Sequence, residues 1–142
     1  MNGNGQREAG LAEFVERALT EVCFGGEEEY PLEPTVARYF HPGYRQRVDG
    51  EVLGYDEFVA HLRLVRARVA PGSRIEVHEA LRDGARIADR HTVHVVKPDG
   101  GRIETDVYLF GEFADDQRLL RVDEVSRMVS GGAEDADLGS AR

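Results

Sequence analysis

Histidine and cysteine are the side chains best suited to bind a metal ion, and their spacing in this chain does not form a metal site. His91 and His94 lie three positions apart in a run that predicts a β-strand, so they point to opposite faces of it. His78 could share a face with His94, but two ligands without a third do not make a zinc site. Cys23 is the only cysteine, which excludes an internal disulfide and a cysteine cluster. We therefore expect no metal.

The sequence also gives little support for a phosphate-binding site or for a catalytic nucleophile. No glycine-rich loop of the kind that holds phosphates lies between a predicted strand and a predicted helix, and we expect no cofactor. Thr92 and Ser126 lie in predicted strands, where hydroxyl side chains more often bond to backbone or water than act as nucleophiles. Cys23 lies inside a predicted helix and reads as a buried, inert thiol.

Length and charge set the class of the protein. The 142 residues are 41% hydrophobic, enough for one domain with a real core. The net charge of -9, without a basic cluster, argues against nucleic acid or an anionic membrane as a partner. No apolar run is long enough to cross a bilayer, and Met1 to Gly10 lacks a signal-peptide hydrophobic region. We expect a cytoplasmic protein.

The C-terminal half predicts a four-stranded antiparallel meander. Its runs are rich in β-branched and aromatic residues and are separated by turn-forming segments such as Asp83-Gly84 and Pro98-Asp99-Gly100-Gly101. The predicted strands are residues 74–82, 85–97, 102–113 and 118–129. Apolar residues occur on both faces of these strands, so both faces are expected to be covered, one of them by a dimer partner.

Three helices are expected ahead of the meander. Apolar residues recur at three- and four-residue spacing, and Gly or Pro follows each run. The predicted helices are residues 8–24, 36–40 and 55–70, with a short strand over 44–48. Helices that cover one face of an antiparallel sheet make an α+β domain, here over 8–129. Residues 1–7 are expected to be flexible, and 130–142 to form an acidic, disordered or loosely docked tail.

Three segments carry a family resemblance: Tyr39-Phe40-His41-Pro42-Gly43-Tyr44, Ile87-Ala88-Asp89-Arg90-His91-Thr92-Val93, and the run from Phe110 to Val125. With the order of the elements, they resemble the nuclear transport factor 2-like superfamily, in particular its SnoaL-like branch. The resemblance implies a cone-shaped α+β barrel of the cystatin-like roll type, in which a curved sheet and helices enclose an apolar pocket, and a homodimer. It does not settle the activity, because the superfamily hosts several enzymes and many non-catalytic domains.

The resemblance also implies which side chains face the pocket, a choice that strand alternation alone leaves open. Pocket or ligand-binding positions are then Gln46, Arg90, Thr92, His94, Val107, Leu109, Val122, Glu124 and Ser126. The opposite set would lie on the convex face and form the dimer interface, with Val93, Tyr108, Phe110 and Val125.

The catalytic residues of three enzyme types in the superfamily match this chain to different extents. The ketosteroid isomerase roles fall near Ala18, Gln46 and Leu109, none of which is the required residue type. Limonene-epoxide hydrolases are matched by Arg90 and Glu124, but Thr92 replaces their first carboxylate. SnoaL-like cyclases use an acidic residue on the last strand, a position that Glu124 matches. These cyclases also use a histidine, and His94 is the nearest candidate for it in this chain.

Two functions therefore remain open. In the first, the domain binds a hydrophobic small molecule in an apolar pocket and can be a cofactor-independent cyclase, isomerase, dehydratase or hydrolase, with Glu124, Arg90 and His94 as catalytic residues. A buried carboxylate tuned by its partner transfers protons with rate gains of about 10²- to 10⁴-fold. In the second, Arg90 and Glu124 form a buried ion pair and the protein is a non-catalytic dimeric association module.

Overall fold

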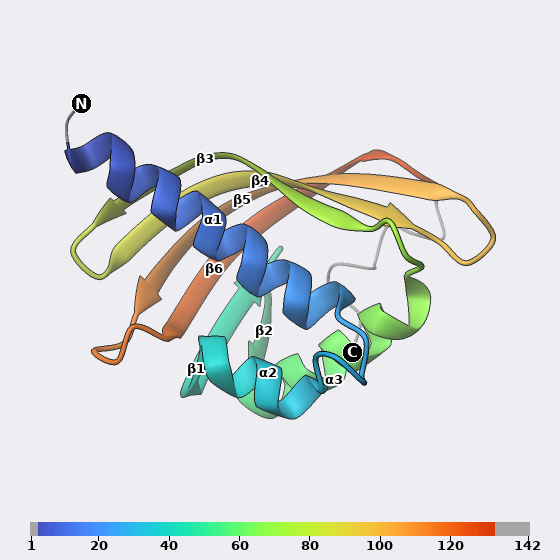
Figure 1. Ribbon diagram of the computed structural model, residues 1–142, viewed down its shortest axis with the longest axis horizontal. Coiled ribbons are helices and arrows are strands. Elements are labelled where there is room, and N and C mark those ends of the chain that lie inside the picture. The colour runs from blue at the N-terminus through green and yellow to red at the C-terminus, as the bar shows by residue number, and fades with distance from the viewer. Residues whose placement is uncertain (1–2, 133–142) are drawn as a thin grey trace.

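The computed structural model describes the chain from Gly3 to Gly132, and it contains the predicted helices and the predicted meander. The elements, labelled in Figure 1, are α1 (Gly3–Phe24), α2 (Leu32–Tyr39), β1 (Phe40–Val48), β2 (Glu51–Gly54), α3 (Tyr55–Arg68), β3 (Arg74–Asp83), β4 (Arg86–Val96), β5 (Arg102–Phe113) and β6 (Leu119–Ser130). The α+β class is confirmed.

The sheet is larger than the predicted meander and is mixed. Its six strands run in the order β2-β1-β6-β5-β4-β3, and β1 pairs with β6 in parallel. The short strand β2 was not predicted, and β1 begins at Phe40, so His41-Pro42-Gly43 lies within a strand where the sequence predicts a break. A register shift between Phe40 and Arg45 accommodates the proline, which a regular strand interior would exclude.

The elements at the two ends of the chain extend beyond the predicted domain bounds. α1 begins at Gly3, ahead of the predicted helix start at Glu8, and the flexibility of residues 1–7 stays a prediction. β6 continues to Ser130, one residue into the predicted tail. The remainder of that tail, residues 133–142, lies outside the described residues.

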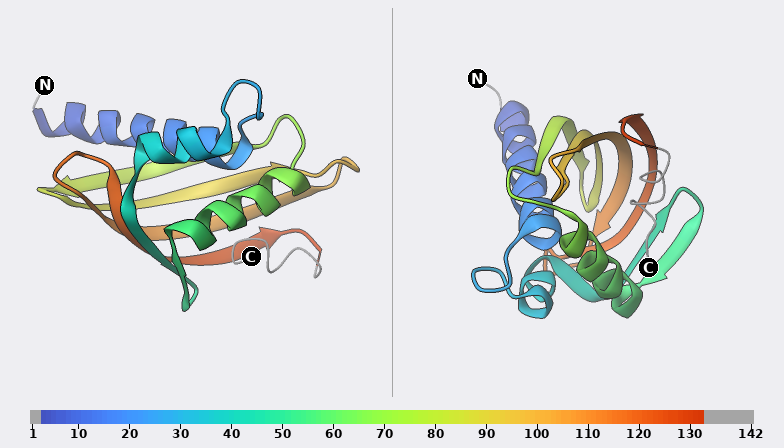
Figure 2. Two further views of the ribbon diagram at one scale, coloured as in Figure 1. Left: turned by 90° about the horizontal axis from the view of Figure 1, so that it is seen from below. Right: turned by 90° about the vertical axis from the view of Figure 1, so that its right-hand side faces the viewer.

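The curved sheet and the helices together enclose an interior. Figure 2 shows the sheet curling around this space while α1 lies along one side and α2 and α3 lie at one end. α1 packs on β3, and α3 packs on β1. An aromatic cluster fills the region between β1 and α3, where the rings of Phe40, Tyr44 and Phe58 lie with centroids 4.8 Å apart. This packing holds the helices at the inner face of the sheet.

An irregularity in β3 ties α1 to the sheet. The register of β3 with β4 shifts between Val77 and Glu79, which turns His78 outward. The backbone N–H of Val77 donates to the carboxylate of Glu16 on α1 at 3.0 Å. The helix is therefore anchored to the edge strand by a hydrogen bond as well as by apolar contacts.

The β3–β4 turn depends on a glycine in the left-handed region. Gly84 has φ +61°, a conformation that costs an L-residue about 1 kcal/mol or more. We expect Gly84→Ala to lower the free energy of unfolding by about 1 kcal/mol in urea denaturation. Gly10→Ala, on an exposed position of α1 with open space around it, is the matched control and should raise that free energy by about 0.5–1 kcal/mol. Equal effects of the two substitutions would contradict the assignment.

Candidate functional site

A cavity of about 160 Å³ lies between the helices and the inner face of the sheet. Most of its wall is apolar and comes from α1, α3 and the strands β1, β3, β4, β5 and β6. Its polar wall residues include Tyr44, Gln46, His61, Asp89, His91, Glu124 and Ser126. A mainly apolar cavity with a few converging polar groups is the usual form of a small-molecule site.

The strand register decides which side chains reach this cavity. Asp89 pairs with Leu109, and Leu109 pairs with Glu124, so these three residues form one row across β4, β5 and β6. Directly opposed residues share a face of the sheet. Among the sequence-predicted pocket residues, the structure places six on the cavity wall: Gln46, Val107, Leu109, Val122, Glu124 and Ser126.

The predicted orientation of β4 is wrong by one residue. Arg90 lies on the outer face of the sheet, where its side chain is 47% exposed and lies 3.9 Å from Glu79. It cannot pair with Glu124, which lines the cavity on the opposite face. Val93, predicted for the outer face, lines the cavity instead.

Thr92 and His94 also lie outside the cavity. The Thr92 hydroxyl donates to Asp106 at 2.8 Å, and its oxygen lies 2.7 Å from Nε2 of His78. His94 sits between two carboxylates, with Nε2 2.8 Å from Glu76 and Nδ1 3.2 Å from Glu104. Both side chains therefore belong to cross-strand networks of the outer face, and neither touches the site.

The register of the β4–β5 hairpin is the sequence feature that would have given the correct orientation of β4. Val96 pairs with Arg102 next to the turn, so odd-numbered residues of β4 oppose odd-numbered residues of β5. An inward Leu109 thus requires an inward Asp89, and Arg90 must share the outer face with Tyr108. Because side chains alternate with a period of two, a slip of one residue exchanges the two faces completely.

The residues that the sequence analysis missed are Asp89 and His91. Nδ1 of His91 lies 2.6 Å from Oδ1 of Asp89, and the two side chains are 3% and 1% exposed. A carboxylate in this position accepts the Nδ1–H bond and orients the ring, which leaves Nε2 for a ligand or a proton. The pair borders the cavity two strands away from Glu124.

Glu124 has the properties of a proton-transfer group. Burial raises its pKa from 4.5 to about 7; the charge of His91 opposes this shift, whereas Asp89 and Asp49 add to it. Within the described residues its carboxyl forms no hydrogen bond or ion pair, and its side chain is half-buried because it borders the cavity. At neutral pH both its acid and its base form are populated.

A second polar pair lines the cavity next to Glu124. The Tyr44 hydroxyl donates to Oε1 of Gln46 at 2.9 Å, so the amide nitrogen of Gln46 is left as a donor. Burial, and then the charge of Glu124, raise the pKa of Tyr44, which keeps the phenol protonated. Burial also raises the pKa of Cys23 to about 12, so its thiol is not a nucleophile at neutral pH.

Comparison with known proteins agrees with this geometry. Residues 32–122 match the family described as SnoaL-like domain. The uncharacterized protein C11D3.04c of Schizosaccharomyces pombe is 31% identical over 104 residues, which are 73% of this chain and 78% of that protein. No helix in the described part of the chain is long and apolar enough to cross a membrane.

Solved structures show the same fold at low sequence identity. AclR, a candidate hydroxylase of Streptomyces galilaeus, superimposes with a TM-score of 0.64 at 16% identity, over 99% of this chain and 89% of that one. Wild-type IdmH, a candidate polyketide cyclase of Streptomyces antibioticus, gives a TM-score of 0.61 at 15% identity, over 78% and 87% of the two chains. Because the family match covers residues 32–122 and the fold agrees with it, the chain belongs to the SnoaL-like domain family.

Proposed function

We propose that the protein is a cofactor-independent acid–base enzyme that acts on a hydrophobic small molecule in the cavity. The observation that carries this proposal is the carboxyl group of Glu124, which has a pKa of about 7 and borders an apolar cavity that the His91–Asp89 pair also borders. A structural role alone would not favour this arrangement, because removing an unpaired carboxylate from water, even in part, destabilises a fold.

The chemistry that fits these groups is proton transfer next to a carbonyl. Glu124 as carboxylate removes a proton from the carbon beside the carbonyl, and the amide N–H of Gln46 donates to the oxygen that becomes negative. Protonated Glu124 then returns the proton to another atom of the substrate. Nε2 of His91 is a second group on the cavity wall that can accept or return this proton. Cyclisation, isomerisation and dehydration all use such a sequence.

The related structures share the fold of this chain and do not define its reaction. AclR is described as a candidate hydroxylase and IdmH as a candidate polyketide cyclase, and both share only the fold with this chain. Since one fold hosts unrelated chemistry, the proposal depends on the site residues. In this site His91, with Asp89, takes the role that the sequence suggests for His94, and Arg90 has no role.

The proposal is tested by hydrogen exchange. The protein is incubated in D₂O with a panel of cyclic ketones and β-diketones, and loss of the proton signal next to the carbonyl is followed by NMR. We expect at least one compound to exchange faster with the protein than with buffer of the same pH. If no compound in a broad panel exchanges faster while the same compounds bind the cavity, the acid–base assignment fails.

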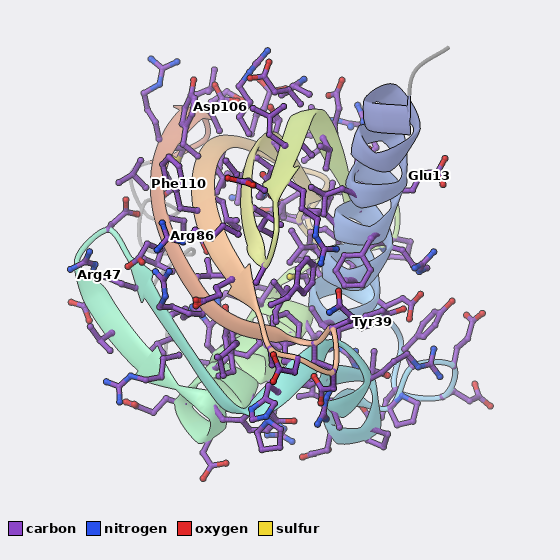
Figure 3. All side chains as sticks on the ribbon, turned by 90° about the vertical axis from the view of Figure 1, so that its left-hand side faces the viewer. Glu13, Tyr39, Arg47, Arg86, Asp106 and Phe110 are labelled. Atoms are coloured by element: carbon purple, nitrogen blue, oxygen red, sulfur yellow. The ribbon has the colours of Figure 1, made fainter. Side chains whose placement is uncertain are left out.

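A second proposal concerns assembly, because the outer face of the sheet exposes large apolar side chains. Tyr108, Phe110 and Val125 are 52%, 69% and 59% exposed, and Tyr108 lies directly opposite Val125 on neighbouring strands. Figure 3 shows Phe110 and Asp106 on the side of the sheet away from α1. Exposed apolar side chains gathered in this way mark an interaction surface.

A second copy of the chain is the partner that fits this face. Acidic and basic side chains around the patch are paired with each other, as in Arg121 with Asp123 at 2.6 Å and Arg127 with Asp106 at 3.7 Å. A face whose charges are balanced can pack against its own copy about a twofold axis without net repulsion. We therefore propose a homodimer through Tyr108, Phe110 and Val125, with Val93 removed from the predicted interface.

Replacing Phe110 by Glu tests the dimer. A charge at the centre of an apolar contact should weaken self-association by about 30-fold or more. Light scattering during gel filtration over a range of concentrations measures the effect. Ala60→Glu, on an exposed position of α3, is the matched control and should leave the dimer unchanged. A Phe110→Glu protein with the dimer affinity of the unmodified chain would place the interface elsewhere.

A further inference from the structure

Asp89 carries a buried carboxylate oxygen that has no hydrogen-bond partner among the described residues. Its side chain is 1% exposed, and Oδ1 takes the bond from His91, while Oδ2 has none. A buried acceptor without a donor is costly, and native folds rarely retain one without a use. Because Asp89 lines the cavity, a bound ligand can supply the missing donor.

The surroundings of Asp89 define what the ligand must offer. Its neighbours on the cavity wall, Ile87, Val107 and Leu109, are apolar and have no side-chain donor. No side chain on this part of the wall can donate to Oδ2, so an O–H or N–H of a ligand would satisfy it, whereas a ligand with acceptors alone would not. A full positive charge is disfavoured, because most of the surrounding cavity wall is apolar and would desolvate it.

The cavity also limits the size of the ligand. Its volume is about 160 Å³, close to that of an apolar cavity of about 150 Å³ that holds benzene. Asp89 and Glu124 lie two strands apart in one row, so their Cα atoms are separated by about 10 Å. A single six-membered ring between the two side chains fills this volume and can contact both of them.

We propose that the natural ligand is a compact, one-ring hydrophobic compound with a hydroxyl group, whose O–H donates to Oδ2 of Asp89. The opposite edge of the ring then lies toward Glu124. The expectation that Glu124 reacts with this edge rests on the proposed function. Asp89 is thus a specificity-determining residue as well as the residue that orients His91.

Two matched probes test the inference. Cyclohexanol and cyclohexanone have the same ring, but only the alcohol donates a hydrogen bond. We expect the unmodified protein to bind cyclohexanol about 10-fold more tightly than cyclohexanone in NMR titrations. Equal affinities, or a preference for the ketone, would overturn the inference. Tightest binding of cyclohexylammonium would overturn the hydroxyl in favour of a cation. The comparison needs no variant, so it holds even if a variant fails to fold.

The Asp89→Asn variant tests the residue. Its amide oxygen can still accept from His91, while its NH₂ group replaces Oδ2 and turns an acceptor into a donor. The preference for the alcohol should then be lost or reversed, with the same circular dichroism spectrum as the unmodified protein. A preference that persists in a folded Asp89→Asn protein would assign the hydroxyl to another group.

The two proposals fail in different ways. Glu124→Gln should retain the alcohol preference, because Oδ2 of Asp89 is unchanged, and it should lose catalysed exchange. Loss of the preference in Glu124→Gln would move the hydroxyl contact from Asp89 to Glu124 and overturn the inference. Retained exchange in that variant, with the preference intact, would overturn the proposed function alone.

Discussion

Replacing Glu124 by Gln is expected to lower the catalysed proton exchange by about 10²- to 10⁴-fold, the usual contribution of a general acid or base. Gln keeps the size and shape of the side chain but cannot take or give a proton near neutral pH. The ligand should still bind, so the loss should fall on kcat rather than KM. The measurement is the exchange rate of the most active ketone at saturating concentration, for the unmodified and variant proteins.

Two further substitutions separate this site from the one that the sequence suggested. His91→Gln should also lower the exchange rate, because His91 borders the cavity. Arg90→Gln should leave the rate unchanged, since Arg90 lies on the outer face beside Glu79. Glu104→Gln, the same chemical change as in Glu124→Gln but on the outer face near His94, completes the controls. A large loss in Arg90→Gln with normal activity in His91→Gln would restore the first assignment and refute the observed register.

The stability of the fold should depend on the protonation of Glu124. Its pKa rises from 4.5 to about 7 on folding, chiefly through burial. Below pH 4.5 the group is protonated in both states and costs nothing. Between pH 4.5 and 7 the unfolded chain loses the proton first, so stability falls as the pH rises. Above pH 7 the loss reaches about 3 kcal/mol and stays constant.

Glu124→Gln should abolish this pH dependence. The difference in unfolding free energy between the variant and the unmodified protein should grow by about 3 kcal/mol in favour of the variant from pH 4 to pH 9. Urea denaturation followed by circular dichroism measures it, and the other titrating groups cancel because both proteins share them. A difference that does not change with pH would show that the carboxyl is solvated or paired in solution.

The two results together would describe a trade between activity and stability. A substitution that stabilises the fold at pH 9 and abolishes turnover identifies a residue kept for its chemistry. Asp89 follows the same logic, because its unpartnered oxygen costs stability until a ligand donates to it. Both residues that lower the stability of the fold lie on the same cavity wall, as expected for a functional site.

Local sequence signals were sufficient for the elements of the fold. Apolar spacing of three and four residues predicted the helices, and turn residues such as Asp83-Gly84 marked the hairpins that the structure contains. These signals act within a few residues, so they carry through to the folded state. Pairing between distant segments has no such local signal, which is why the parallel contact of β1 with β6 and the strand β2 were missed.

The orientation of β4 could be predicted from the sequence only in part. Alternation separated Asp89 and His91 from Arg90 correctly, and the short β4–β5 turn could have shown which set shares a face with Leu109. Transferring positions from relatives shifted the strand by one residue and put the wrong set inside. A hairpin register is a local property of the chain, so it was the safer guide.

Patterns along the chain were sufficient for the α+β class, the family and the position of Glu124 on the last strand. The folded arrangement was needed to find that Glu124 shares an apolar cavity of about 160 Å³ with the His91–Asp89 pair, and that Arg90 does not enter it. Burial and proximity arise from elements that are far apart in the chain, and it is burial that raises the pKa of Glu124 and leaves one oxygen of Asp89 to a ligand.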